Sequence, residues 1–389
     1  MTSNHRPRGG ARLPKAVRAV ATAALVTAGL GAASPASAVP GPASATEVKC
    51  GAVVTSDVTL TADLTCPGTA LTVGADNVVI DLAGHTIRGP GSPGSGIEVG
   101  NHSNTVVDNG TISGFFSGIS ATGSTARGTG TGLTVIRTRF TDNAKVRLTN
   151  VSASFSGSQQ TCALEGLSAV KSTVTVDNCT VHNGIVLDQT RGTIRSSALT
   201  SGALQLEESS GGLYSGNVFD NFGISLLKPS TRNLFVDNTM KNTATAISGN
   251  TPQAPETTNT FKDNVIRDNN VGFRGYDSTG YAIRQNRFTG NRTVGILIDN
   301  KADRDNPEWI SDNVFTNNGR SPNGIRDRDG NPVRGGIHIR TVPGSRIGLA
   351  RNTGASNVGP LIWVPEGQII DGGGNQGPCA PVNPDLKCD

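Results

Sequence analysis

The chain is poor in aromatic residues, in methionine and in long apolar runs. Aromatic side chains make up 4% of its 389 residues, and there are only two tryptophans and two methionines. Patterns typical of long helices are absent, and no apolar run after residue 33 approaches the roughly eighteen residues of a membrane-spanning helix. Glycine, by contrast, occurs 50 times. This composition favours tight, repeated strand-and-turn units over a helical fold.

Motifs of several common enzyme classes are also missing. The sequence has no G-x-S-x-G, no phosphate-binding loop and no H-E-x-x-H, which argues against an α/β-hydrolase, a P-loop nucleotidase and a zincin. It has no C-x-x-C and no cluster of cysteine with histidine, so a zinc site is a poor explanation for its six cysteines.

The first 38 residues have the pattern of a secretory signal peptide. A basic region with five lysines and arginines precedes an apolar run, mostly Ala, Val, Leu and Gly, at 19–33. An A-x-A cleavage site follows at 36–38, with a second option at 43–45. We therefore expect removal of residues 1–38, a short flexible lead at 39–49, and an extracellular mature protein with no membrane span.

Net charge gives no reason to expect a nucleic-acid partner. The whole chain carries a formal charge of +4, but the five basic residues of the signal region account for this excess. Without them, 29 basic residues face 30 acidic ones, a net charge near −1. Because no basic stripe interleaved with aromatics is present either, we expect no binding of nucleic acid.

Two phrases alternate along the chain. One is a glycine followed by an apolar, a variable and a second apolar residue, and the other is an asparagine followed two residues later by a large apolar side chain. Neighbouring asparagines of the second phrase lie 21, 26, 22 and 27 residues apart. The glycine phrases begin at Gly96, Gly118, Gly184, Gly223, Gly295 and Gly336, and the asparagine phrases are Asn217/Phe219, Asn238/Met240, Asn264/Ile266, Asn286/Phe288 and Asn313/Phe315.

This repeat predicts an all-β solenoid. A period of about twenty-two residues is typical of proteins in which each repeat buries its apolar face by stacking on its neighbours. The apolar residues alternate with a period of two, so the units are strands. Asparagine suits the turns, because it tolerates left-handed backbone and its amide can form a ladder between coils. We expect about ten coils over 50–375, and a C-terminal tail at 376–389 tied down by its cysteines.

Residues 50–89 resemble the opening of bacterial right-handed parallel β-helix proteins of the pectin-lyase-like superfamily. The most specific part is D-L-A-G-H-T-I, from Asp81 to Ile87, and the two phrases extend the resemblance over roughly 50–375. The resemblance implies a single-stranded right-handed parallel β-helix. It leaves function open, because this fold carries lyases, glycosidases, epimerases and adhesins.

An even number of cysteines in a secreted chain favours disulfides. Six cysteines allow fifteen pairings, and the sequence does not choose among them by itself. We expect the pairs that are close in sequence, because Cys162 and Cys179 lie about one coil apart and could bridge adjacent coils. The expected pairs are Cys50–Cys66, Cys162–Cys179 and Cys379–Cys388.

One outward face of the later coils gathers chemically versatile side chains. In each glycine phrase the first and third residues after the glycine should point into the core, and the second and fourth should point outward. If the coils stack in order, the outward positions bring Arg274, Tyr276, Asp299, His338 and Arg340 onto one face. These five are the candidate catalytic residues, since together they could bind an anionic sugar polymer or hold an acid/base pair. An ordinary solvated strand face is the alternative.

Two polar insertions, at 299–308 and 319–335, are expected to leave the same edge of this face and to wall it as a groove. Asp303 and Asp305 in the first insertion are candidate substrate contacts, and so is Trp309 at its end. The Trp309 indole could stack on a sugar ring, or it could cover the core at the start of the next strand.

A candidate calcium loop lies in the second insertion. The oxygens of Asp327, Asp329 and Asn331 are spaced as ligands for Ca²⁺, although the same string also reads as a simple turn. Residues 340–346 resemble the R-x-P-x-x-R motif of pectate lyases with one residue added. That resemblance implies that Arg340 abstracts the sugar C5 proton, that Arg346 contacts the substrate, and that calcium neutralises the uronate.

Two functional classes therefore remain open. The protein is either an enzyme on extracellular polysaccharide, as a lyase, an epimerase or a glycoside hydrolase, or a non-catalytic β-helix that binds glycans, cell wall or a partner surface. The expected partner is a polysaccharide or a cell-surface glycan, and calcium is the only cofactor that the sequence suggests. A deep cleft with converging charged groups would favour the enzyme, and a flat polar sheet would favour the binding protein.

Overall fold

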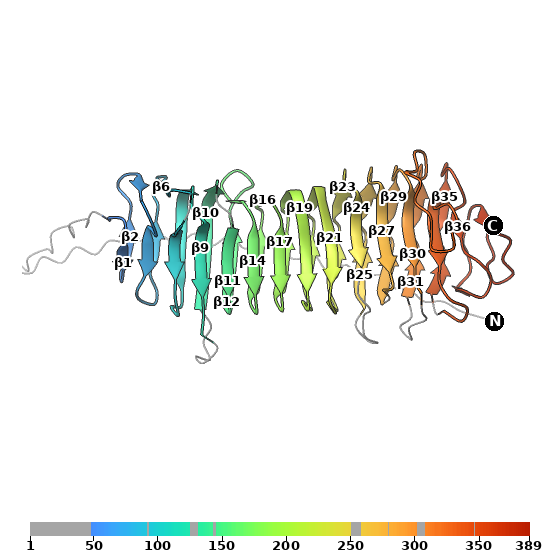
Figure 1. Ribbon diagram of the computed structural model, residues 1–389, viewed down its shortest axis with the longest axis horizontal. Coiled ribbons are helices and arrows are strands. Elements are labelled where there is room, and N and C mark those ends of the chain that lie inside the picture. Colours follow the sequence, from blue (N-terminus) through green and yellow to red (C-terminus); the bar gives the residue numbers. More distant parts are fainter. Residues whose placement is uncertain are drawn as a thin grey trace, which may run out of the picture. The chain divides into compact units, whose positions relative to one another are not determined.

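The computed structural model describes residues 48–389, except 92, 125–130, 143–144, 250–257, 279, 302–307 and 346. The expected signal peptide at 1–38 and most of the lead at 39–49 lie outside the described residues. The described chain is the expected right-handed parallel β-helix, drawn in Figure 1 as one stack of short strands from β1 to β38. Among its residues there is no helix with the length and hydrophobicity to span a membrane.

Each complete coil contributes a strand to three parallel sheets, which we name faces A, B and C in chain order. Face A consists of β1 (Ala52–Val54), β4 (Leu71–Val73), β7 (Ser95–Val99), β9 (Ser117–Thr122), β11 (Lys145–Thr149), β14 (Leu167–Val170), β17 (Ile185–Asp188), the second halves of β19 (Ala198–Glu207) and β21 (Val218–Leu227), β24 (Thr245–Gly249), β27 (Val271–Tyr276), β30 (Val294–Asp299), β33 (Gly335–Arg340), β36 (Ile362–Trp363) and β38 (Cys379–Ala380).

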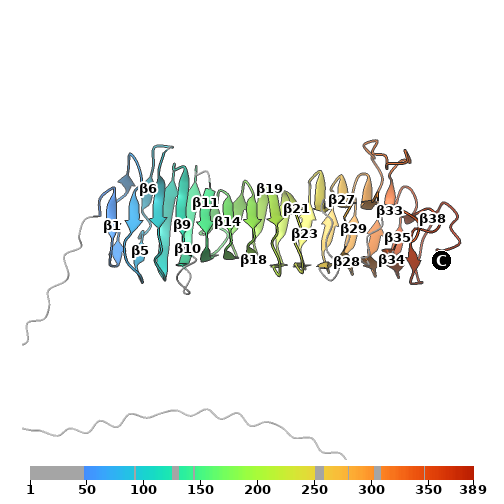
Figure 2. The same cartoon turned by 60° about the horizontal axis from the view of Figure 1, so that its bottom comes forward.

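Faces B and C complete the triangle, and Figure 2 shows the stack turned to a second side. Face B consists of β2 (Val58–Thr59), β5 (Val79–Asp81), the first halves of β8 (Thr105–Ser113) and β10 (Thr131–Thr141), β12 (Val151–Ser156), β15 (Thr173–Asp177), β18 (Arg191–Arg195), β20 (Leu213–Ser215), β22 (Leu234–Val236), β25 (Asn259–Lys262), β28 (Tyr281–Arg284), β31 (Glu308–Ser311), β34 (Ile347–Ala350) and β37 (Ile370–Asp371). Face C consists of β3 (Leu64–Thr65), β6 (Thr86–Arg88), the second halves of β8 and β10, β13 (Ala163–Leu164), β16 (Thr180–His182), the first halves of β19 and β21, β23 (Thr239–Lys241), β26 (Val265–Arg267), β29 (Arg287–Thr289), β32 (Val314–Thr316) and β35 (Thr353–Ala355).

A ladder of buried asparagines joins the coils where face B turns into face C. The Oδ1 atom of Asn238 accepts hydrogen bonds from the backbone N–H of Asn217, at 2.9 Å, and from its Nδ2, at 3.1 Å. The same pair of bonds repeats at every step to the end of the ladder. Its members are Asn217, Asn238, Asn264, Asn286, Asn313, Asn352 and Asn375. The predicted amide ladder is therefore confirmed.

The left-handed backbone lies one residue before each ladder asparagine, rather than at the asparagine itself. Asp237, Asp263 and Asp312 have φ of 55°, 54° and 58°, whereas Asn238, Asn264 and Asn313 do not have positive φ. The preceding residue thus makes the corner, which frees the asparagine amide to turn inward.

The structure has about 13 coils, so the sequence-based number of ten was too low. The earlier coils have no asparagine at this corner, where Ser197 and Cys179 stand instead. The backbone N–H of Ser197 donates to Asn217, and that of Cys179 donates in turn to the Ser197 hydroxyl. Hydroxyl side chains also form a second ladder, from Ser172 through Thr190 to Ser209.

The core is a line of stacked apolar side chains inside the triangle. Tyr214, Phe235 and Phe261 stack at successive positions of face B, with ring centroids 4.5 and 4.7 Å apart. The glycine of the repeated phrase is required for close packing at the corner into face A. At Gly295, a Cβ atom would lie 2.6 Å from the Gly336 carbonyl oxygen and 2.7 Å from the Phe315 ring.

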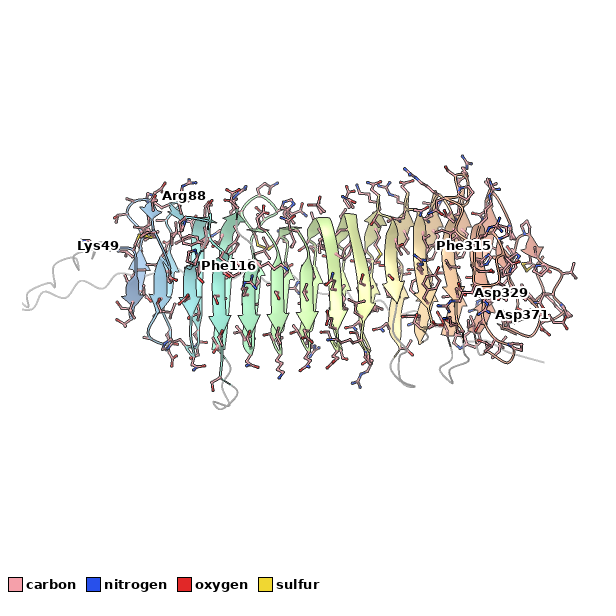
Figure 3. All side chains as sticks on the ribbon, viewed as in Figure 1. Lys49, Arg88, Phe116, Phe315, Asp329 and Asp371 are labelled. Atoms are coloured by element: carbon pink, nitrogen blue, oxygen red, sulfur yellow. A yellow bond between two sulfur atoms is a disulfide. The ribbon has the colours of Figure 1, made fainter. Side chains whose placement is uncertain are left out.

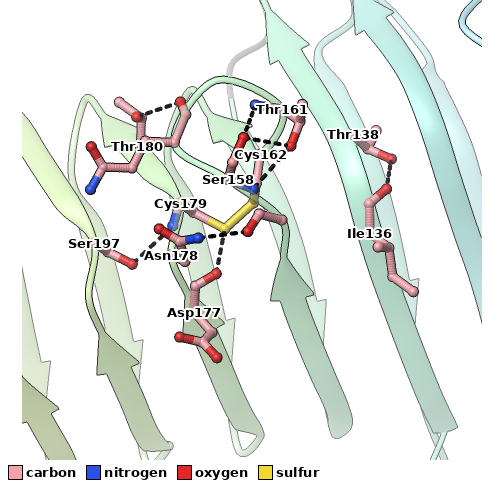
Figure 4. Close-up of a disulfide and its surroundings, with 12 residues drawn as sticks. Ile136, Thr138, Ser158, Thr161, Cys162, Asp177, Asn178, Cys179, Thr180 and Ser197 are labelled. Atoms are coloured by element: carbon pink, nitrogen blue, oxygen red, sulfur yellow. Dashed lines mark hydrogen bonds between the residues drawn. A yellow bond between two sulfur atoms is a disulfide. The ribbon is translucent and has the colours of Figure 1, made fainter.

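Three disulfides join the pairs that were expected. Cys50–Cys66 and Cys379–Cys388 lie near the two ends of the stack, and Cys162–Cys179 joins neighbouring coils in its interior. Figure 4 shows the interior bridge beside the hydrogen bond from Cys179 to Ser197. The bridges add covalent ties to a solenoid whose coils otherwise contact only their neighbours.

We predict that Asn264→Ala lowers the free energy of unfolding by roughly 2–4 kcal/mol, because it removes the acceptor of the buried Asn238 N–H and a donor to the Phe235 carbonyl. Chemical denaturation followed by circular dichroism measures this loss. The control is Asn101→Ala, since Asn101 is exposed and outside the ladder. Its change should stay within about 0.5 kcal/mol, and equal losses in both variants would contradict a special role for the ladder.

Candidate functional site

The five candidate catalytic residues lie on face A in the predicted register. Tyr276 pairs with Asp299, and Asp299 pairs with Arg340, on the successive strands β27, β30 and β33. Arg274 and His338 lie in the neighbouring column, on either side of Leu297. The strand periodicity therefore correctly predicted that these five side chains lie on one surface.

We expected the two polar insertions to leave the same edge of that surface, and this prediction is wrong. The first follows β30 on face A and leads to β31 on face B, whereas the second follows β32 on face C and leads back to β33 on face A. They flank face A on opposite sides. Asp303 and Asp305 of the first insertion, and Arg346, lie outside the described residues.

The second insertion folds back over face A. We name residues 319–334 the covering segment, which lies beside β33 (Figure 2). Val333 is buried against Leu297, and together with Val271 and Val294 they form a small apolar cluster separate from the main core. Ile325 packs against the same cluster. The outward side chain of Leu297 is 0% exposed as a result.

Charged side chains of the covering segment bind those of face A. Asp327 contacts His338 at 3.0 Å, between Oδ2 and Nε2. Asp329 accepts two hydrogen bonds from the Arg340 guanidinium, at 2.7 and 2.9 Å. On the other side, Arg328 donates to both oxygens of Asp277, at 2.6 and 2.8 Å, and to the Asp299 carbonyl oxygen. The candidate groove is therefore filled by the chain itself.

The histidine of the candidate set is sealed in. The side chains of His338 and Asp327 are both 0% exposed, and the imidazole stacks on Trp363 with ring centroids 4.1 Å apart. Burial lowers the pKa of His338 despite the nearby carboxylate. For Asp327, hydrogen bonds from His338 and Asn331 outweigh the effect of burial and hold its pKa below the usual value. A neutral His338 donating from Nε2 to an ionised Asp327 fits both shifts.

Arg274, Tyr276 and Asp299 are also engaged. The Arg274 guanidinium lies over the Tyr276 ring, 4.1 Å from its centroid, and donates to its hydroxyl. The Asp299 side chain is 2% exposed, and burial raises its pKa even though Arg328 and Arg340 oppose that shift. All three candidate side chains therefore already interact with other groups of the protein instead of being free for a ligand.

The candidate calcium ligands have protein partners. The Asp327 carboxylate accepts from the backbone N–H groups of Asp329 and Asn331 and from the Asn331 amide, besides His338. Asp329 is held by Arg340. In the described part of the chain, no three His, Cys, Asp or Glu residues gather as a metal site. The geometry thus fits the alternative that the sequence left open, a hydrogen-bonded turn.

Trp309 belongs to a different surface from the other candidates. It is the second residue of β31 on face B, and its side chain is 43% exposed. It borders a hollow of about 440 Å³ that is also lined by Arg284, Ser311 and Arg351. The indole therefore faces solvent outside the core, where it is available for a ligand.

The Trp309 ring lies flat on the next coil. Its register partner is Gly348, where a Cβ atom would come within 2.4–2.7 Å of the indole carbons. Gly372 lies beside the same ring, at 3.3 Å for the equivalent atom. Glycine backbone thus supports one face of the indole and leaves the other face outward, a geometry that the spacing of tryptophan in the sequence does not predict.

Glu308 is an ionisable group buried at the end of the first polar insertion. It is 0% exposed, at the start of β31, and neither carboxylate oxygen has a hydrogen-bond partner among the described residues. Burial raises its pKa to about 8. The strand alternation accounts for this burial, because Glu308 occupies an inward position and Trp309 next to it points outward.

We predict that Arg328→Ala loosens the covering segment, because it removes the bonds to Asp277 and to the Asp299 carbonyl oxygen. Cleavage near Ile325 by a protease specific for apolar residues should become roughly three- to tenfold faster. Arg320→Ala is the matched control, since Arg320 is exposed and its guanidinium donates, among the described residues, only to Asn317, in the turn just before the segment. Unchanged cleavage of the Arg328 variant would contradict the prediction and would show that the apolar cluster and the contacts with His338 and Arg340 are sufficient to hold the segment.

Glu308 predicts a pH dependence of stability. Between its ordinary pKa of 4.5 and the folded value of about 8, the folded protein keeps a proton that the unfolded chain has released. Stability should therefore fall as pH rises through that window, by up to about 1.4 kcal/mol per unit. Glu308→Gln should remove this slope in thermal melts from about pH 5 to about pH 8. The exposed control Glu366→Gln should keep it, and a wild-type curve without the slope would contradict the prediction.

Comparison with known proteins agrees with the fold. Residues 165–318 match the family model described as a right-handed beta helix region. No curated protein matches the chain in sequence. Among solved structures, the chain resembles the GH136 lacto-N-biosidase from Eubacterium ramulus at 12% identity and a TM-score of 0.42, over 75% of this chain and 62% of that one. It therefore spans less than two thirds of that protein's length.

Two further solved structures match the chain with lower TM-scores. The hyperthermoactive exopolygalacturonase from Thermotoga maritima matches at 9% identity and a TM-score of 0.34, over 77% of this chain and 85% of that one. The Dettilon tailspike protein matches at 14% identity and a TM-score of 0.32, over 82% and 60%. The parallel pairing of the coils and the matched repeat region together show that the chain is a right-handed parallel β-helix protein.

Proposed function

We propose that this is a secreted protein that binds extracellular polysaccharide without cleaving it, and that Trp309 on face B is a main contact. The observation that carries the proposal is the Trp309 indole, supported flat on glycine backbone and open to solvent beside a hollow. The C–H face of a sugar ring is apolar and slightly positive. It therefore packs well on the negative face of an indole.

Polar groups around the hollow suit sugar hydroxyls. Ser311 and Arg284 lie in register on neighbouring strands at its edge. Arg351, on the far side, is held by two hydrogen bonds to Asp312, at 2.6 and 3.0 Å. An apolar platform with a few fixed polar groups is the usual composition of a small-ligand site.

The contacts of the candidate residues on face A favour a binding protein over an enzyme. His338 is sealed beneath the covering segment, and Arg340 holds Asp329 and the Asn300 carbonyl oxygen. In the pectate-lyase resemblance, Arg340 would have to take a proton from the sugar. A guanidinium that already donates to a carboxylate and a carbonyl is poorly placed for that step. Secretion, for its part, is supported by the signal-like region at 1–38 and by three disulfides.

We expect Trp309→Ala to weaken retention on a polysaccharide column at least about tenfold, because it removes the stacking platform. The matched control is Phe116→Ala, another exposed aromatic, which lies toward the opposite end of the stack from Asp329 (Figure 3). Its retention should equal that of the wild type.

The same polysaccharides should be assayed for unsaturated products by ultraviolet absorbance and for new reducing ends, with and without calcium. Binding without either product supports the proposal. Product formation that survives Trp309→Ala and is lost in Arg340→Ala would instead establish the enzyme on face A.

A further inference from the structure

From β5 to β37, the central outward column of face B carries no charge. Strand pairing places its members in one continuous line, with one residue from each coil. We name this line the face-B stripe. Its members are Val79, Val106, Thr134, Ser154, Thr175, Thr193, Leu213, Leu234, Thr260, Ala282, Trp309, Gly348 and Ile370.

Exposed apolar side chains concentrate in this line. Of the nine large hydrophobic side chains exposed in the described chain, four belong to the face-B stripe, although it contains only one residue per coil. They are Leu213, Leu234, Trp309 and Ile370, with exposures of 37, 36, 43 and 44%. The other stripe positions between Thr134 and Ala282 are small or carry a hydroxyl group. The flat face of a sugar chain also carries apolar C–H groups and hydroxyl groups, so the two surfaces are chemically complementary.

The adjacent column of face B, two residues later on each strand, is charged at many coils. It includes Asp108, Asp177, Arg195, Lys262 and Arg284. Several of these charges are paired on the surface, as Arg195 is with Asp177 at 2.9 Å and Arg137 with Asp108. Charged residues are therefore common on face B but absent from the face-B stripe.

We infer that the face-B stripe is the binding track for an extended, uncharged polysaccharide that lies along the axis of the solenoid and passes over Trp309. The inference rests on the proposed function and names the ligand class and its path. A polyanion on this line would be desolvated without a counter-charge, which is unfavourable. A neutral chain loses no charge solvation and buries the C–H faces of its rings on the apolar positions.

The length of the stripe argues for a polymer rather than for a small sugar. From Thr193 on β18 to Ile370 on β37 it crosses eight strands, or about 34 Å at 4.8 Å per coil. The hollow beside Trp309 is one place along this line, so a ligand seated there continues over Ala282 and Leu234 on one side and Ile370 on the other.

The test places a charge in the track, away from Trp309. Leu234→Asp lies three coils from Trp309 in the register. It should weaken binding to an insoluble β-1,4-glucan or a β-1,4-N-acetylglucosamine polymer at least about tenfold. Val218→Asp is the matched control, because Val218 is 40% exposed but lies on face C. It should bind as the wild type does, and raising the salt concentration should leave wild-type binding unchanged.

Each other result overturns the inference in a distinguishable way. If Trp309→Ala abolishes binding and Leu234→Asp does not, the track is wrong and the proposed function stands. If the wild type binds a polyuronate in a salt-sensitive manner and neither neutral polymer, the ligand class is wrong. If Leu234→Asp dissociates a dimer in sedimentation velocity, the stripe is an interface between copies of this chain. Binding to none of the polymers removes the proposed function as well.

Discussion

The fold depends on how each coil satisfies the polar groups at its own corners. A triangular coil must turn its backbone three times against an apolar core, and a turning strand cannot pair all of its N–H groups within the sheets. In the later coils, one asparagine oxygen accepts both the backbone N–H and the side-chain Nδ2 of the asparagine one coil earlier. The corner is therefore closed only when the next coil is in place, and this makes the stacking specific.

The fixed register has opposite consequences on two faces. On face A it aligns Tyr276, Asp299 and Arg340, and the covering segment binds the Arg340 guanidinium and the Asp299 carbonyl oxygen. On face B it aligns uncharged residues, and nothing in the described chain folds over Trp309. A candidate active site was thus closed by its own insertion, while an unremarkable strand position became the most accessible aromatic surface of the later coils. Face A has the more reactive side chains, but face B is the one that is exposed, and only an exposed face can contact a ligand.

Sequence periodicity was sufficient for the fold and for the face A register, because both follow from local alternation and from the spacing of Asn and Gly. The coil number was too low, and in two earlier coils Ser197 and Cys179 occupy the corner where later coils have asparagine, with the Ser197 hydroxyl accepting from the Cys179 N–H. The position of the covering segment could not be read from its sequence, since Asp327 and Asp329 satisfy a calcium-loop spacing and a salt-bridged turn equally well. Trp309 was tied to the wrong surface because the insertion before it was assumed to share an edge with the insertion before β33.

The asparagine ladder tolerates coils of very different size. Its successive steps span 21, 26, 22, 27, 39 and 23 residues, yet every step makes the same two hydrogen bonds. Additional residues leave at the corners and do not disturb the rise of the stack. The spacing between coils therefore stays fixed along the stack, while the loops at the corners vary in length and sequence. The gain or loss of a whole coil would lengthen or shorten each face by one strand, and the surface chemistry of the remaining coils would be unchanged.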